Sequence, residues 1–141
     1  MKRIKNGFTL IEVLVTVVIV GILMAVAMPA YNDYVIRGRL TEAFSALGAA
    51  QPAAEQFWSN GRTYVGFDTV VNFPAATANF TYALSGASAS AYTLTATGIG
   101  KMAGFVYTID QNGTRATTAS PAGWGTNGTC WVDHKGGSCS N

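Results

Sequence analysis

The sequence predicts an α+β fold, in which one long N-terminal helix packs on a four-stranded antiparallel sheet that is followed by a C-terminal disulfide-bonded loop. Three observations lead to this prediction. A continuous apolar stretch over residues 8–30 is followed by apolar side chains at helical spacing. Beyond residue 79 the apolar side chains recur at every second position, which is typical of strands. Two cysteines, Cys130 and Cys139, lie close together near the C-terminal end.

Composition limits the classes of protein that this chain can represent. Its 141 residues suffice for one compact domain once a membrane segment is set aside. Charged residues make up 11% and hydrophobic residues 49%, a balance that disordered chains do not have. The net charge is +2, but Lys2, Arg3 and Lys5 supply three of the nine cations, which leaves six cations against seven carboxylates. DNA is a possible partner, but the near-neutral charge of the rest of the chain does not support DNA binding.

The apolar stretch from Phe8 to Ala30 contains a single charged residue, Glu12. As a helix rising about 1.5 Å per residue it is roughly 34 Å long, enough to span a bilayer. Lys2, Arg3 and Lys5 all lie on the N-terminal side of this stretch. The positive-inside rule therefore keeps the N-terminus in the cytoplasm and exports the part that follows.

Two hypotheses of processing fit this N-terminus. A secretory signal would be cut after the Ala-Val-Ala stretch at 25–27 and would leave a product starting at Met28. Its apolar region would then exceed the usual length of about 7 to 15 residues and would contain a carboxylate. The alternative cut follows Gly7, where the missing side chain lets a protease approach the backbone. That cut keeps the helix and exposes a new amine on Phe8.

Three residues are unusual for a membrane helix. An unpaired carboxylate such as Glu12 costs about 2.5 to 3.5 kcal/mol on insertion, so we expect it to have a partner. Gly21 and Pro29 are weak points, because glycine costs about 1 kcal/mol relative to alanine and proline removes a backbone donor. Ordinary tolerance of both residues in membrane helices is the alternative explanation.

The helix is expected to continue over about 31–58 and to become amphipathic, with an apolar stripe facing the sheet. The stripe consists of Leu40, Phe44, Leu47, Ala54, Phe57 and Trp58. Pro52 is expected to kink or interrupt this helix, and Ser59-Asn60-Gly61 is a stop signal. The segment from about residue 59 to residue 78 has no sustained hydrophobic period and is predicted to form a connecting loop.

The sheet is expected over about 79–118. Three runs with period two predict three strands, and their apolar members are Phe80, Tyr82 and Leu84, then Tyr92, Leu94 and Ala96, then Phe105, Tyr107 and Ile109. A fourth strand, 114–118, follows Asn112-Gly113, which is a strong two-residue hairpin signal.

The exported cysteines, Cys130 and Cys139, have a spacing that permits a disulfide. A metal site would have to recruit Asp133 and His134, a spacing that matches no usual zinc pattern, so we expect no metal and no cofactor. His134 is the only histidine, and no hydroxyl or thiol is visibly paired with it. The sequence is therefore not expected to encode an enzyme.

The string Gly7-Phe8-Thr9-Leu10-Ile11-Glu12, after a six-residue basic leader and before a long apolar helix, resembles the processing site of the type IV pilins. The resemblance continues through Gly21, Pro29, the segment 30–34 and the cysteine pair, and so covers nearly the whole chain. It implies a cleaved leader, 1–7, a transmembrane or filament-core helix, 8–30, and a globular domain, 31–141, which ends in a disulfide region, 119–141.

This resemblance also implies a function. A prepilin peptidase would cleave between Gly7 and Phe8 and methylate the Phe8 amine, and Glu12 would pair with the Phe8 ammonium of a neighbouring subunit. An intrachain pair between the same two residues is the alternative. The helix between Gly21 and Pro29 would melt in the filament.

The implied partners are other pilin subunits, the peptidase, the assembly platform of the inner membrane, and the membrane itself before assembly. The implied protein is a structural subunit of a surface pilus for adhesion, twitching motility or DNA uptake. A minor pilin, either a tip subunit or a DNA receptor, and a pseudopilin of a type II secretion system are the alternatives.

Overall fold

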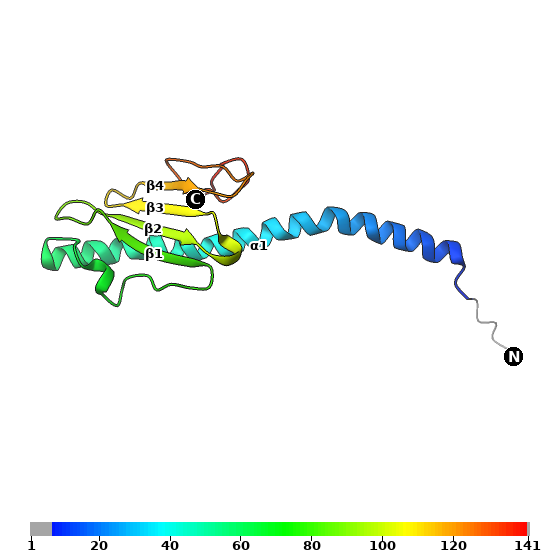
Figure 1. Ribbon diagram of the computed structural model, residues 1–141, viewed down its shortest axis with the longest axis horizontal. Coiled ribbons are helices and arrows are strands. Elements are labelled where there is room, and N and C mark those ends of the chain that lie inside the picture. The colour runs from blue at the N-terminus through cyan, green and yellow to red at the C-terminus, as the bar shows by residue number, and fades with distance from the viewer. Residues whose placement is uncertain (1–6, 141) are drawn as a thin grey trace. The chain divides into compact units, whose positions relative to one another are not determined.

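The computed structural model describes residues 7–140, where one helix of 52 residues, α1 (Leu10–Gly61), precedes four strands (Figure 1). The strands are β1 (Phe80–Ser85), β2 (Thr93–Gly98), β3 (Val106–Asp110) and β4 (Arg115–Ala119). They form one antiparallel sheet in the order β1-β2-β3-β4. Two 3-10 turns, η1 (Phe67–Thr69) and η2 (Gly100–Met102), lie in the connections. The predicted α+β arrangement of one long helix and a four-stranded sheet is confirmed.

The chain divides into two compact units, one up to Val35 and one from Ile36 to Asn141. α1 belongs to both units and is continuous through Gly21, Pro29 and Pro52. The expectation that Pro52 interrupts the helix is therefore wrong. Pro52 lies on the exposed face, so water can solvate the carbonyl that it leaves without a donor. The helix ends at Gly61, as its stop signal predicts. Looser turns between Gly21 and Pro29 in a filament stay a prediction.

The core of the second unit lies between α1 and the sheet. The buried helical side chains are Leu40, Ala43, Leu47, Ala50 and Ala54, and the strands contribute Phe80, Leu94, Ala96, Tyr107 and Ile109. Phe44, Phe57 and Trp58 are partly buried and pack against this cluster. The predicted stripe is thus confirmed, and the structure adds two alanines, Ala43 and Ala50. Their small side chains let the helix backbone come close to the strands.

The hairpin between β3 and β4 is longer than predicted. The Asp110 amide donates to the Thr114 carbonyl over 3.2 Å, so three residues lie in the loop rather than two. Gly113 has φ +74°, the left-handed value that closes a three-residue hairpin. The Asp110 carboxylate also accepts hydrogen bonds from the amides of Asn112 and Thr114, at 2.9 and 2.8 Å. A side chain that bonds the loop backbone therefore selects the longer loop.

We expect Gly98→Ala to destabilise the second unit by about 1 to 3 kcal/mol, the range for overpacked cores. A Cβ atom on Gly98 would lie 2.0 Å from the Met102 carbonyl oxygen, which is a backbone atom and cannot turn aside. Thermal unfolding of the full-length protein in detergent, followed by near-ultraviolet circular dichroism, measures the change. Gly48→Ala is the matched control. Its added Cβ meets nothing within 4 Å, so it should stabilise α1 by about 1 kcal/mol. Equal stabilities of the two variants would contradict the predicted clash.

Candidate functional site

The described chain begins at Gly7, and α1 begins three residues later. Gly7 is exposed, and a Cβ atom placed on it would meet nothing within 4 Å. The Thr9 carbonyl accepts hydrogen bonds from the amides of Glu12 and Val13, at 3.1 and 3.3 Å, and Thr9 Oγ1 accepts a second bond from the Glu12 amide at 3.3 Å. Thr9 is therefore the N-cap of α1. This role was not predicted from the sequence, although Thr9-Leu10-Ile11-Glu12 fits the capping-box pattern.

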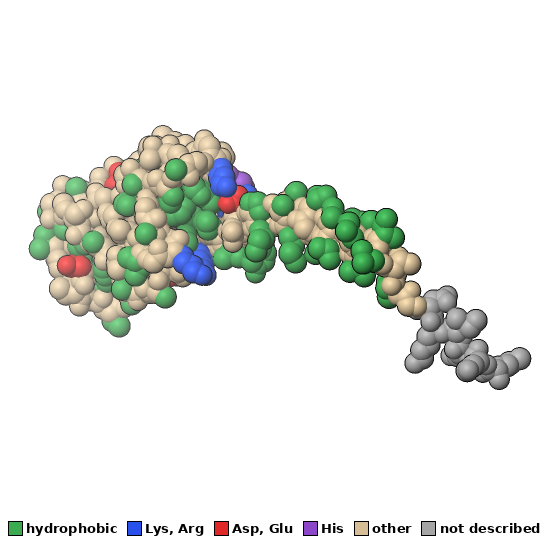
Figure 2. All heavy atoms as spheres, turned by 45° about the vertical axis from the view of Figure 1, so that its right-hand side comes forward, with side chains coloured by type: hydrophobic (Ala, Val, Ile, Leu, Met, Phe, Trp, Pro, Cys, Tyr) green, Lys and Arg blue, Asp and Glu red, His purple; other side chains and the backbone are tan. Residues whose placement is uncertain are grey.

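The Glu12 side chain is exposed, and no ion pair within residues 7–140 involves it. Apart from Thr9 and Thr16, the residues around it at the start of α1 are apolar, and Figure 2 shows hydrophobic side chains along the visible face of this helix. Phe8, Leu10 and Ile11 are 82, 84 and 70% exposed. The structure therefore places the predicted pair, Phe8 and Glu12, at the start of an uncovered apolar helix.

This apolar part of α1 is long enough to cross a membrane by length and composition. An 18-residue window within it has a mean hydropathy of 2.8, and none of that window is buried in the chain. Gly21 and Pro29 lie within the same unit as Glu12. A Cβ atom on Gly21 would meet nothing within 4 Å, so its own chain does not require a glycine there.

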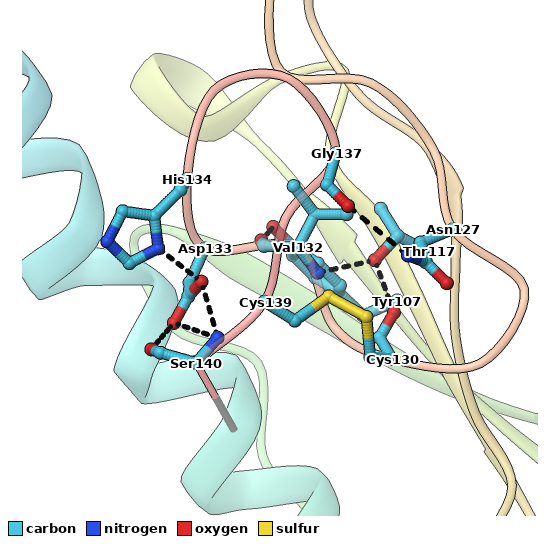
Figure 3. Close-up of polar contacts among 10 residues, drawn as sticks. All are labelled: Tyr107, Thr117, Asn127, Cys130, Val132, Asp133, His134, Gly137, Cys139 and Ser140. Atoms are coloured by element: carbon cyan, nitrogen blue, oxygen red, sulfur yellow. Dashed lines mark hydrogen bonds and ion pairs between the residues drawn. A yellow bond between two sulfur atoms is a disulfide. The ribbon is translucent and has the colours of Figure 1, made fainter.

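The predicted disulfide is present between Cys130 and Cys139, whose Cα atoms are 6.3 Å apart (Figure 3). It closes residues 130–139, called the disulfide segment below, against β3 and β4. Thr117 of β4 is buried, and its hydroxyl donates to the Cys130 carbonyl at 3.0 Å and accepts from the Val132 amide at 2.8 Å. The Tyr107 hydroxyl donates to the Val132 carbonyl at 2.9 Å, and burial raises the pKa of this phenol. The first half of the closed segment is thus held by hydrogen bonds as well as by the disulfide.

Asp133 holds the second half of the segment. Its carboxylate accepts hydrogen bonds from the Ser140 amide, at 3.0 and 3.2 Å, from the Ser140 hydroxyl, and from the ring of His134 at 2.6 Å. Burial opposes ionisation of Asp133, but the hydrogen bonds from Ser140 and His134 and the charge of His134 together hold its pKa below the usual value. Asp133, considered above with His134 as a metal ligand, therefore fixes Ser140 next to Cys139.

The Trp131 ring lies between two side chains from different elements. Phe44 of α1 stacks on it with ring centres 5.3 Å apart, and the Arg115 guanidinium lies 4.5 Å from its ring centre. The indole nitrogen donates to the Thr108 carbonyl at 2.8 Å. These contacts tie α1, β3, β4 and the disulfide segment together.

Glu42 makes a contact that the sequence analysis missed. Its carboxylate accepts hydrogen bonds from the Asn79 side chain, at 2.7 Å, and from the Thr77 hydroxyl. Both partners lie at the end of the loop that leads into β1. Glu42 therefore attaches the start of the sheet to α1. No local pattern could reveal this contact, because the partners are 35 and 37 residues away.

Comparison with known proteins agrees with this geometry. Residues 2–28 match the family described as "Prokaryotic N-terminal methylation motif", and residues 29–106, more than half of the chain, match "Type IV minor pilin ComP, DNA uptake sequence receptor". The chain belongs to the type IV pilin family. The resemblance found in the sequence is thereby confirmed, and this pilin is described as such below.

Several relatives of the pilin are fimbrial proteins. It is 43% identical over 60 residues to the fimbrial protein EcpC of Eikenella corrodens, 39% over 69 residues to a fimbrial protein of Moraxella nonliquefaciens, and 42% over 60 residues to the type IV major pilin protein PilE1 of Neisseria gonorrhoeae. These regions cover 43, 48 and 43% of this chain. They cover 39, 45 and 36% of the relatives, so the pilin matches less than half the length of each.

Proposed function

We propose that this pilin is a structural subunit of a bacterial type IV pilus, held in the inner membrane before assembly and found in the surface filament afterwards. The single observation that carries the proposal is the first part of α1, whose large apolar side chains are exposed around the whole helix. An apolar surface of that size needs a cover. A bilayer provides one before assembly, and the same helix of neighbouring subunits provides one in a filament.

Within this proposal, Glu12 meets the Phe8 ammonium of an adjacent subunit. Opposite charges attract strongly where the surroundings are apolar. Desolvation of both groups offsets much of that attraction, so the pair contributes mainly to the register of the incoming subunit rather than to net stability. The Thr9 cap supports this role, because it starts the helix at Leu10 and so sets the position of the carboxylate.

Assembly requires that the new amine on Phe8 be released by cleavage after Gly7. We expect Gly7→Phe to block cleavage, because a bulky side chain keeps the peptidase from the backbone. The folded chain itself should be unaffected, since a Cβ atom at Gly7 meets nothing within 4 Å. The intact mass of the membrane-extracted protein measures the outcome. The wild type should carry an N-methylated Phe8 as its first residue, and the variant should keep its leader.

Gly21→Phe is a control for bulk in the same apolar unit, and its leader should be removed as in the wild type. A wild-type mature chain that begins at Met28 would contradict the whole proposal, because the filament helix would then be lost with the signal.

The amount of the pilin in filaments separates its two structural roles. Sheared surface filaments are analysed by gel electrophoresis. A dominant band from this chain supports a main subunit, and a trace band supports a minor pilin at the tip or in assembly.

A second candidate function is a minor pilin that binds DNA, and the match of residues 29–106 to a family described as a DNA uptake sequence receptor favours it. The candidate contacts are Lys101, Arg115 and Lys135, which come from η2, β4 and the disulfide segment. Scattered solubilising charges are the alternative explanation of these three residues.

Binding of duplex DNA to the full-length pilin in detergent, measured over a salt series, tests this second function. A receptor should lose affinity linearly with the logarithm of the salt concentration, with a slope of about −0.9 for each phosphate neutralised, and should prefer one sequence over its scrambled form. The triple variant K101Q/R115Q/K135Q should reduce the slope by about three, whereas R62Q should leave it unchanged. Equal affinity for both duplexes, unaffected by the triple substitution, would rule this function out.

A further inference from the structure

The charged side chains of the second unit, Ile36–Asn141, are unevenly distributed along α1. We call the end of this unit that contains Ile36 the proximal end, and the end that contains Gly61 the distal end. Four of its six cations belong to segments at the proximal end, namely Arg37 and Arg39 of α1, Lys101 of η2 and Lys135 of the disulfide segment. Three of its five carboxylates, Glu55, Asp68 and Asp110, lie towards the distal end. Figure 2 shows basic side chains, with an acidic side chain among them, on the surface of the second unit at its proximal end.

Contacts within the unit place η2 at the proximal end. Arg37 and Arg39 are in the first turns that α1 contributes to it, and Glu42 follows one turn later. Glu42 holds Asn79, which precedes β1, and the Asn79 carbonyl accepts from the Ile99 amide at 2.8 Å, immediately before η2. Lys101 therefore lies at the same end of the unit as the helical arginines, and it is exposed.

The disulfide segment brings the fourth cation to the same end. Trp131 stacks on Phe44, which lies less than two turns beyond Arg39, and the segment continues to His134 and Lys135. Figure 3 shows His134 beside the α1 ribbon. Lys135 is exposed.

The two proximal carboxylates are engaged in hydrogen bonds inside the unit. Glu42 accepts from Thr77 and Asn79, and Asp133 accepts from Ser140 and His134. Of the two remaining cations of the unit, Arg62 lies over Trp58 at the distal end, and Arg115, at the start of β4, lies over Trp131. The proximal end is thus the basic end of the unit.

We propose that this basic end is a docking surface for anionic phospholipid headgroups, which holds the globular unit against the bilayer until the pilin enters a filament. The inference rests on the membrane anchoring proposed above. Arg37 follows Ala30, the last residue of the apolar stretch, by seven residues, about 10 Å as a helix and at most about 25 Å if fully extended. The only carboxylate between them is Asp33. The tether therefore keeps the basic end within reach of the headgroups, where each cation strengthens attachment about five-fold.

A second copy of the pilin is the competing occupant, since the acidic distal end of one subunit complements the basic end of another. The tether favours the lipid, because it keeps the bilayer near the basic end of every anchored pilin, whereas a second copy arrives only on assembly.

The test uses the full-length mature pilin carrying R62K, reconstituted in vesicles of phosphatidylcholine alone or with about 30% phosphatidylglycerol. An uncharged N-hydroxysuccinimide ester acetylates lysines, and peptide mass spectrometry gives the rate at Lys101. The lysine introduced by R62K reports on the distal end of the same molecule. We expect the anionic lipid to slow acetylation of Lys101 at least about three-fold while the distal lysine changes little, and about 0.5 M salt to remove the effect.

Charge removal provides the specific control. R37Q/R39Q added to the reporter should weaken attachment about 25-fold and so abolish the protection of Lys101. Equal protection of both lysines, or of neither, would overturn the inference, as would protection that appears only in sheared filaments, which would assign the basic end to a second copy. Failure of the protein to float with either vesicle would instead refute membrane anchoring, and the inference with it.

Discussion

Glu12→Gln should leave the processed pilin in the membrane at the wild-type level and should nearly abolish surface filaments. The leader, Gly7 and the apolar helix are unchanged, and an amide costs less to insert than a carboxylate, so insertion and cleavage proceed. Assembly fails because the amide loses the charge that attracts the incoming subunit. The Phe8 ammonium of that subunit is then left unpaired in an apolar environment, which is costly. N-methylation of Phe8 is expected to fall as well.

The structure makes this substitution a clean test of the carboxylate. The Thr9 cap binds the Glu12 backbone amide and not its side chain, so Glu12→Gln keeps the start of α1. If Glu12 only interacted with its own helix terminus, the loss would be about 0.3 to 1 kcal/mol and filaments would be nearly normal.

Electron microscopy of sheared filaments, with membrane levels matched by immunoblot, measures the outcome. Thr16→Val is the matched control. Its hydroxyl, one turn after Glu12, donates to the Glu12 carbonyl at 2.7 Å, so the variant loses a polar group without a charge and should assemble. Wild-type filament numbers from the Glu12→Gln strain would refute the intersubunit pair.

Cys139→Ser should destabilise the second unit by about 2 to 5 kcal/mol and lower the yield of filaments, while membrane insertion is spared. The structure indicates where the loss falls. The Cys130 side stays attached to β3 and β4 through Tyr107 and Thr117, whereas the Cys139 side is held by bonds within the segment and to the loop 123–127. We therefore expect faster amide hydrogen exchange in residues 133–140 than in β3 and β4.

Two further measurements check the disulfide prediction. Wild-type pilin treated with a reductant should unfold at the same temperature as Cys139→Ser, since both lack only the cross-link. Thr117→Val keeps the disulfide but removes both bonds of the buried hydroxyl, and it should loosen residues 130–132 instead. Free thiols at Cys130 and Cys139 in surface filaments, detected by alkylation, would contradict a structural role of the disulfide.

Most of the fold could be predicted because its patterns are local. The alternation at Leu94 and Ala96, and again at Tyr107 and Ile109, gives the buried positions of β2 and β3 correctly. The hairpin loop was predicted one residue too short because the Asp110 side chain bonds the loop backbone, and a dipeptide signal does not include that contact. Continuity of α1 through Pro52 depends on its exposure to water, which only the folded chain defines.

In the candidate site, too, the residues marked by local patterns could be predicted, and the contacts between distant residues could not. Gly7, Phe8 and Glu12 could be selected from the sequence because a processing motif is contiguous and a lone charge in an apolar stretch is conspicuous. The contacts of Glu42 and Tyr107 join residues 25 to 37 positions apart and have no pattern in the chain. The basic end also arises only on folding, since Arg37, Lys101 and Lys135 are far apart in the sequence.

The order of the sheet has a consequence for how the pilin folds. Because the spatial order β1-β2-β3-β4 repeats the order along the chain, each strand pairs with one that was synthesised just before it. Such a topology has short loops to close and is expected to fold quickly. Both cysteines follow the last strand, and two cysteines allow one pairing, so oxidation cannot trap a wrong isomer. We expect the disulfide to form last, after the sheet has folded.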